Sequence, residues 1–214
     1  MPAARTIVPI AWALGCGPAV LALLQLPGAA WWAMLGYHAG CLAAVWSAGG
    51  PGPRLHQRWR VGLGVGVLSL AVVLGTGALV RALGLLPVGE IPRWSRWGLR
   101  PPIDLVWLAL YVIVNPWVEE RFWRGALLAP PFRAQAGRRT SLALAILAFG
   151  VHHAVVLGAS LGWVRGALFV LPVVAAGALW TAIRLRSGGI APAVASHRGA
   201  DLALALLYCW QWRS

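Results

Sequence analysis

Seven long apolar runs dominate this sequence and limit the folds that are open to it. A membrane-spanning helix needs about 20 predominantly apolar residues. Only helices and closed barrels satisfy their backbone hydrogen bonds inside lipid, and these runs are too long and continuous for barrel strands. The sequence therefore predicts an all-α fold, a polytopic transmembrane helical bundle of about seven spans and up to eight helices. The predicted spans lie near residues 7–26, 29–48, 61–85, 103–126, 140–159, 163–183 and 189–211.

The overall composition agrees with a membrane protein. Hydrophobic residues make up 60% of the 214 residues and charged residues only 11%, whereas a soluble domain carries about 25% charged residues. The connecting stretches are short, and the chain shows no internal repeat and no low-complexity tail, so we expect a single membrane domain over 1–214. The first run is as long as a full span and is followed closely by another, which favours a retained helix over a signal peptide.

The net charge of +13 comes from 18 arginines, with no lysine in the chain. These arginines are spread between the apolar runs rather than gathered on one face, so we expect them to set topology and contact lipid headgroups, with no nucleic-acid partner. They favour an N-terminus on the cytoplasmic side, and the residue usage suggests a bacterial inner membrane. Three cysteines at unrelated spacings indicate neither a disulfide framework nor a zinc–thiolate site.

Four charges stand at the end of the fourth run, in "PWVEERFWRGALL" at 116–128. Glu120 and Arg124 are four residues apart, so they share a helix face and can pair. Glu119 points about 100° away, and an unpaired carboxylate in an apolar setting suits a general base. Pro116 can loosen the helix just before it. The alternative is that these charges form a salt-bridged helix end at the membrane interface.

Two later runs also carry ionisable residues. In "ILAFGVHHAVV", Phe149 and His153 share a helix face, while His152 is turned away; in "ASHRGADLAL", His197 and Asp201 are again four residues apart. Taken singly, each histidine can be a packing residue or half of a local His–Asp pair. Together the three places hold three of the five acids and three of the five histidines.

Buried ionisable groups must find partners inside a bundle, so these groups can converge. One free carboxylate, two histidines and one further acid suit a centre that activates water. No serine or cysteine pairs with a base at a suitable spacing, since Ser196 faces away from its neighbour His197. We therefore expect direct hydrolysis by activated water, without an acyl-enzyme.

The three motifs together resemble those of the CPBP family, which joins the type II CAAX prenyl endopeptidases and the bacterial Abi proteins. "EERFWR" reads as E-E-x-x-x-R, "FGVHH" as F-x-x-x-H and "HRGAD" as H-x-x-x-N/D. Their order and their placement on separate spans carry the resemblance, which covers a core of about 103–210. The resemblance implies a glutamate-based intramembrane endopeptidase.

By this resemblance, Glu119 and His153 would activate the water, and His197 and Asp201 would steady the oxyanion. The prenyl endopeptidases carry Asn at the position of Asp201, and an ionised Asp cannot donate a hydrogen bond. Asp201 would then be protonated, or it would orient His197. The family leans toward a mechanism without cofactor, although Glu119, His153 and His197 could form an open zinc site. The supporting residues would be Glu120, Arg124 and Phe149.

The expected partners are the lipid bilayer and a membrane-embedded peptide or protein substrate, such as a C-terminal sorting signal or a peptide precursor. Two other readings stay open. The chain could be a non-enzymatic membrane protein, an immunity factor or scaffold, whose polar residues only hold helices together. It could also be a proton-coupled transporter, although such proteins usually show paired halves, and no repeat is visible here.

Overall fold

The computed structural model describes residues 4–49, 59–84, 97–99 and 102–212, and in these residues every regular element is helical. The all-α prediction is confirmed. Each predicted span corresponds to a long helical stretch, and the predicted connecting segments around 49–60 and 87–102 lie largely outside the described residues. The elements are α1 (Ala4–Leu23), α2 (Ala29–Ser47), α3 (Trp59–Ala82), α4 (Ile103–Glu120), η1 (Arg121–Ala126), α5 (Pro130–Ala136), α6 (Arg138–Ala143), η2 (Leu144–Ala148), α7 (Phe149–Leu161), α8 (Trp163–Ser187) and α9 (Ala191–Trp212).

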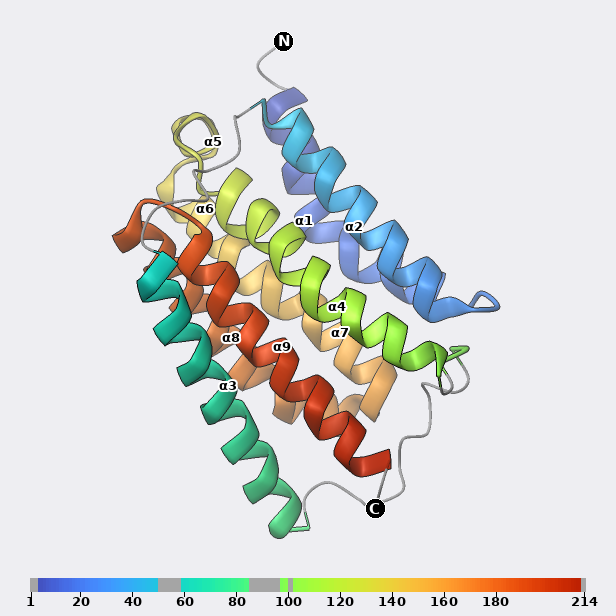
Figure 1. The fold of residues 1–214 in the computed structure, drawn as a ribbon. Coiled ribbons are helices and arrows are strands. Elements are labelled where there is room, and N and C mark those ends of the chain that lie inside the picture. Colours follow the sequence, from blue (N-terminus) through green and yellow to red (C-terminus); the bar gives the residue numbers. More distant parts are fainter. Residues whose placement is uncertain (1–3, 50–58, 85–96, 100–101, 213–214) are drawn as a thin grey trace.

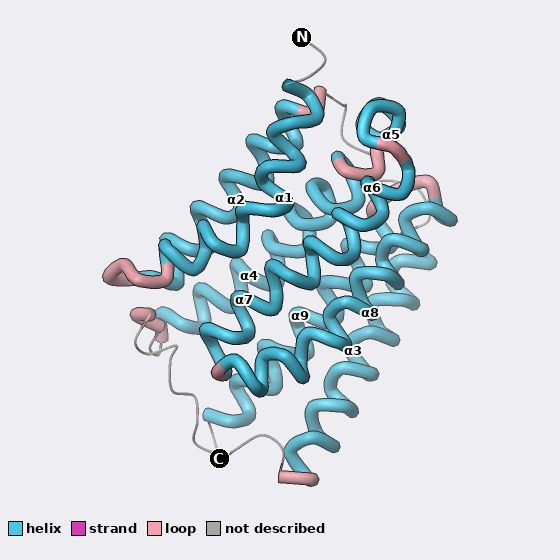
Figure 2. Tube along the Cα trace, turned by 180° about the vertical axis from the view of Figure 1, so that it is seen from behind, coloured by secondary structure: helices cyan, strands magenta, loops and turns pink. Residues whose placement is uncertain are grey.

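The long helices form a bundle with α4 and α9 at its centre (Figure 1). The α1–α2 pair flanks α4 on one side, and α3 packs mainly against α9 on the other. Seen from behind, α7 and α8 cover the opposite face, where they pack against each other and α7 also meets α1 (Figure 2). The helices α4, α7 and α9, which carry the predicted site residues, therefore face a common interior.

Two π-helical turns interrupt this bundle beside the predicted site. The turn η1 follows directly after the two glutamates that end α4, and η2 directly precedes Phe149 at the start of α7. The helix α4 continues through Pro116 and changes to π geometry only after Glu120. Such turns are rare and often mark functional sites.

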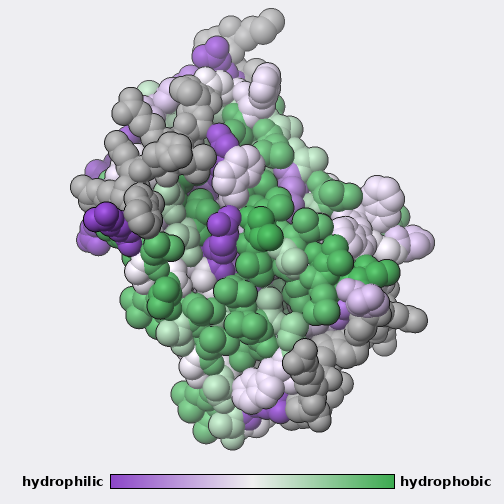
Figure 3. Space-filling model, viewed as in Figure 1, coloured by the Kyte–Doolittle hydropathy of each residue, from purple (hydrophilic) through white to green (hydrophobic). Residues whose placement is uncertain are grey.

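Apolar side chains cover much of the outside of the bundle. On the face shown in Figure 3, hydrophobic residues fill most of the middle, as expected for contact with lipid. Within the described residues, four stretches are long and apolar enough to cross a membrane. The remaining long helices, α2, α4 and α9, are those whose polar residues meet inside the bundle. The four stretches are Arg5–Leu23, Arg60–Ala82, Arg138–Leu161 and Trp163–Ser187.

Candidate active site

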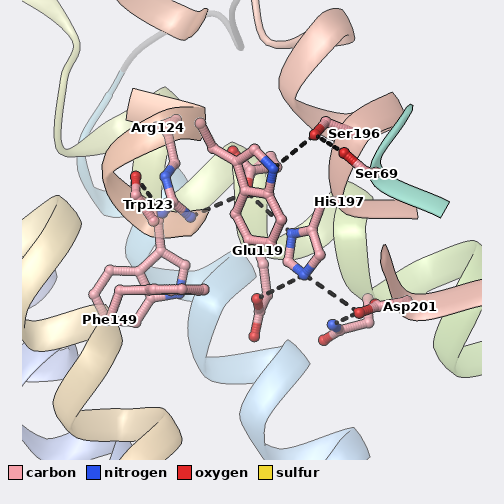
Figure 4. A network of polar contacts seen from close by, with 12 residues as sticks. Ser69, Glu119, Trp123, Arg124, Phe149, Ser196, His197 and Asp201 are labelled. Carbon is pink, nitrogen blue, oxygen red and sulfur yellow. Dashed lines mark hydrogen bonds and ion pairs between the residues drawn. The ribbon is translucent and has the colours of Figure 1, made fainter. Parts of the chain in front are cut away.

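The residues predicted from the three motifs come together between α4, η1, α7 and α9 (Figure 4). They are far apart in the sequence, and only the packing of three separate helices unites them. Most are almost completely withdrawn from the surface, while His153 is half-buried. The buried members are Glu119, Glu120, Arg124, Phe149, His197 and Asp201.

The predicted pair of Glu120 and Arg124 is present and completely buried. Arg124 Nη1 lies 3.0 Å from Glu120 Oε1, with both side chains 0% exposed. Arg124 Nη2 also donates to the Gly177 carbonyl at 3.0 Å, and the guanidinium lies 4.3 Å from the centre of the Phe149 ring. A side chain at Gly177 would crowd this arginine, because its Cβ would lie 3.1 Å from Nη2. The absence of a side chain at Gly177 therefore allows the Arg124 guanidinium to pack against α8.

The imidazole of His197 lies between three carboxylates. Its Nδ1 is 3.0 Å from Glu120 Oε1, a hydrogen bond in which the ring donates to the carboxylate. Its Nε2 lies 3.6 Å from Glu119 Oε2 and 3.6 Å from Asp201 Oδ1, both too long for a direct hydrogen bond. The ring stacks on Trp180 at 3.9 Å. Glu120 rather than Asp201 thus holds the ring by hydrogen bonding, and Nε2 points at the two other acids.

Ser196, the neighbour of His197, takes part in a different network. Its hydroxyl accepts a hydrogen bond from Trp180 Nε1 at 2.9 Å and shares one of 2.7 Å with Ser69 of α3. The close-up shows Ser196 and Ser69 pointing away from the carboxylates (Figure 4). This arrangement links α3 to α9 and engages the Ser196 hydroxyl with Ser69 and Trp180.

The two oxygens of Glu119 have different surroundings. Oε1 accepts a hydrogen bond of 2.7 Å from the hydroxyl of Tyr37, which lies on α2. Oε2 is buried and has no hydrogen-bond partner among the described residues, although it faces His197 Nε2. A buried carboxylate oxygen without a donor is unusual. Glu120 Oε2 also has no hydrogen-bond partner among the described residues, but it is Glu119 Oε2 that lies 3.6 Å from His197 Nε2. Such an oxygen is available to a water molecule or a substrate group.

His153 presents one ring nitrogen for chemistry. Its Nδ1 lies 3.0 Å from the Phe149 carbonyl oxygen, which can only accept, so Nδ1 carries the hydrogen. The neutral ring then has its lone pair on Nε2. His153 also interacts electrostatically with Glu119. The two residues that the resemblance assigned to water activation are therefore neighbours in the fold.

Several residues of this network were not identified from the sequence. Asn115 donates to Asp201 Oδ2 at 3.2 Å, and its Oδ1 lies 3.0 Å from His38 Nε2. Tyr37 adjoins His38 on α2. The available signal was the presence of polar residues within apolar runs, and Asn115 stands one helical turn before Glu119. What the sequence could not indicate is that α2 packs against this end of α4.

No group of three or more His, Cys, Asp or Glu residues in the described part of the chain is arranged to hold a metal ion. Glu119 Oε2 lies 3.6 Å from His197 Nε2. A zinc ion held by Glu119, His153 and His197 stays a prediction that removal of metal by a chelator can test.

Part of the chain matches a known protein family. Residues 101–203 match the family described as type II CAAX prenyl endopeptidase, Rce1-like. The matched segment contains Glu119, His153, His197 and Asp201 but does not include α2. No similar protein of curated function and no similar solved structure was found.

Proposed function

Because residues 101–203 place this chain in the Rce1-like family of type II CAAX prenyl endopeptidases, as its motifs predicted, we propose that it cleaves membrane-embedded peptides with a water activated by Glu119 and His153. The family and the apolar helices make the chain an integral membrane protein of a protease family. The observation that carries the finer proposal is Oε2 of Glu119, which has no hydrogen-bond partner in the described part of the chain and is buried beside His197.

In the proposed reaction, Glu119 Oε2 removes a proton from a water molecule that His153 Nε2 helps to orient. The water oxygen attacks the scissile carbonyl carbon, and the carbonyl oxygen becomes an oxyanion. The C–N bond then breaks, and the proton held by Glu119 passes to the leaving nitrogen. No covalent bond to the enzyme forms, in agreement with the absence of a paired serine in the described site.

His197 is suited to stabilise the oxyanion. Glu120 accepts the hydrogen bond from its Nδ1, so only Nε2 can face a substrate. With Glu119 and Asp201 each 3.6 Å from Nε2, the surrounding carboxylates favour a protonated ring that can donate there. Arg124 neutralises Glu120, which keeps Glu120 an acceptor for the ring.

In this proposal, Asp201 has a different role from the asparagine that the prenyl endopeptidases carry at the same position. An ionised carboxylate cannot donate to an oxyanion. Asn115 donates to Asp201 Oδ2 at 3.2 Å and holds the carboxyl group beside His197. Asp201 then acts by orienting His197, whose Nε2 lies 3.6 Å from Oδ1, while oxyanion donation is left to the imidazole.

The substrate class follows from the site's position in a membrane bundle. We propose a membrane-anchored or membrane-inserted peptide, such as a C-terminal sorting signal or a peptide precursor, in a bacterial inner membrane with the N-terminus of the protease in the cytoplasm. Removing such an anchor requires a site that the peptide can reach from within the bilayer, and the described site lies between three helices of the bundle, α4, α7 and α9.

The test is cleavage of a tagged, membrane-anchored substrate by the purified protein. Glu119→Gln removes the base but keeps the shape and the acceptor for Tyr37, so we expect folding to persist and cleavage to fall below detection. The matched control is Asp104→Asn, which alters a buried acid that contacts Tyr208 outside the site and should leave cleavage intact. Normal cleavage by Glu119→Gln would refute the mechanism.

Two further outcomes decide the alternatives. If a strong chelator abolishes cleavage and zinc restores it, the reaction depends on a metal. If no anchored substrate is ever cleaved and Glu119→Gln unfolds the protein, the polar residues serve helix packing, and the scaffold reading replaces the protease.

A further inference from the structure

A residue outside the matched segment reaches the proposed base. Tyr37 lies on α2, 82 positions before Glu119, and its hydroxyl is 2.7 Å from Glu119 Oε1. The tyrosine is buried, and its ring stacks on His152 at 4.4 Å with 6° between the planes. The family match begins only at residue 101. The N-terminal half of the chain therefore contributes a polar contact to the site.

The direction of each hydrogen bond in this chain of contacts is fixed. Trp123 Nε1 lies 3.0 Å from the Tyr37 hydroxyl oxygen, and an indole nitrogen can only donate. The ionised carboxylate of Glu119 can only accept. The Tyr37 oxygen therefore accepts from Trp123, and its hydrogen points to Glu119 Oε1.

This direction distinguishes the two oxygens of the base. Oε1 already accepts the tyrosine hydrogen, which makes it the weaker base of the two oxygens for a proton taken from water. Oε2 has no hydrogen-bond partner in the described residues and faces His197. Trp123 comes one turn after Glu119, within η1, so the π-helical turn helps to place the indole that orients the tyrosine.

We propose that Tyr37 is a positioning residue that makes Oε2 of Glu119 the proton-accepting oxygen, with Trp123 fixing the orientation of its hydroxyl. The inference rests on the proposed function, since it concerns how the same carboxylate acts. Tyr37 does not take part in bond making or breaking. It holds the carboxylate in one rotamer and leaves one oxygen for the water.

The main experiment compares single hydroxyl deletions. Tyr37→Phe keeps the ring that stacks on His152 and removes only the hydrogen bond to Glu119. We expect kcat to fall by about 10- to 100-fold, the range for losing a hydrogen bond to a charged group. KM should change by less than about 3-fold, because a residue that touches no substrate leaves ground-state binding intact. The control is Tyr208→Phe, which also removes a buried hydroxyl from a carboxylate, that of Asp104, and should keep kcat.

A second variant tests the orienting role of the indole. Trp123→Phe removes the donor and frees the Tyr37 hydroxyl to rotate, so kcat should fall less than in Tyr37→Phe. The double variant should be no slower than Tyr37→Phe, because both changes act through one hydrogen bond. Additive losses, an unchanged kcat in Tyr37→Phe, or a loss confined to KM would each overturn the proposal.

An infrared measurement separates this proposal from the proposed function. The carboxylate band that disappears in Glu119→Gln should shift in Tyr37→Phe and stay in place in Tyr208→Phe. If the band shifts in Tyr37→Phe but the protein cleaves no substrate, the hydrogen bond between Tyr37 and Glu119 is present and the proposed protease function is wrong. If the band does not shift in Tyr37→Phe and the native protein cleaves its substrate, the role of Tyr37 is refuted and the protease function is not.

Discussion

Replacing Arg124 by methionine removes the cation from a fully buried ion pair and keeps an unbranched side chain in its place. In the native protein, Arg124 contacts Glu120 Oε1 at 3.0 Å, donates to the Gly177 carbonyl and lies over the Phe149 ring. The variant leaves the buried Glu120 carboxylate with the hydrogen bond from His197 but without its cation. Since the pair shows no exposed surface, solvent cannot replace the lost partner.

The cost can be estimated from these contacts. Breaking a buried ion pair by removing one partner costs about 3–5 kcal/mol. The bond to the Gly177 carbonyl contributes about 1.5–3 kcal/mol and the contact with the Phe149 ring about 0.5–2 kcal/mol. These terms overlap because one group makes all three contacts, so we expect a loss of about 3–5 kcal/mol in the free energy of unfolding.

The assay is reversible unfolding in mixed micelles, followed by circular dichroism as the denaturing detergent is increased. Arg121→Met is the matched control, because Arg121 stacks on Trp117 and is half-buried, and its loss should cost less than about 1 kcal/mol. The double variant Glu120→Gln/Arg124→Met removes both charges and should regain at least half of the loss. A loss below about 1 kcal/mol for Arg124→Met, or a double variant as unstable as the single one, would refute the buried-pair reasoning.

Two further changes test the packing and the other acid of the site. Gly199→Ala would place a Cβ 2.1 Å from the Gly66 carbonyl oxygen and force α3 away from α9, so the melting temperature in detergent should fall; Gly64→Ala, with nothing within 4 Å, should not lower it, and equal effects would contradict the close approach. Asn115→Ala removes the donor to Asp201, so kcat should fall by about tenfold while the protein stays folded. Cleavage at the native rate in Asn115→Ala would show that the Asn115 side chain does not contribute to the reaction.

The sequence predicted those parts of the fold and site that depend on local geometry. Apolar runs of span length predict helices because lipid leaves the backbone few alternatives. Glu120 and Arg124 could be paired in advance, since residues four apart share a helix face. The convergence of Glu119, His153 and His197 was predicted from motifs on three spans, and in the structure Glu119 interacts with both histidines.

The remaining features depend on how helices pack. Tyr37 meets Glu119 only because α2 lies against α4 and η1, which no local pattern indicates. The choice of Glu120 rather than Asp201 as the hydrogen-bond partner of His197 likewise depends on the relative rotation of α4 and α9. The π-helical turn after Glu120 has no simple sequence signal, yet it sets the position of Trp123.

The adjacent residues Glu119 and Glu120 have different proposed roles because their surroundings differ. Glu120 satisfies both Arg124 and His197 through Oε1, so its charge is compensated within the bundle. That compensation removes the need for Glu119 to pair with the arginine. Glu119 then needs only the Tyr37 hydroxyl to hold it, and Oε2 is left without a donor among the described residues. A bundle with a single glutamate here would have to choose between holding His197 and activating water, because an oxygen engaged by arginine is a weak base.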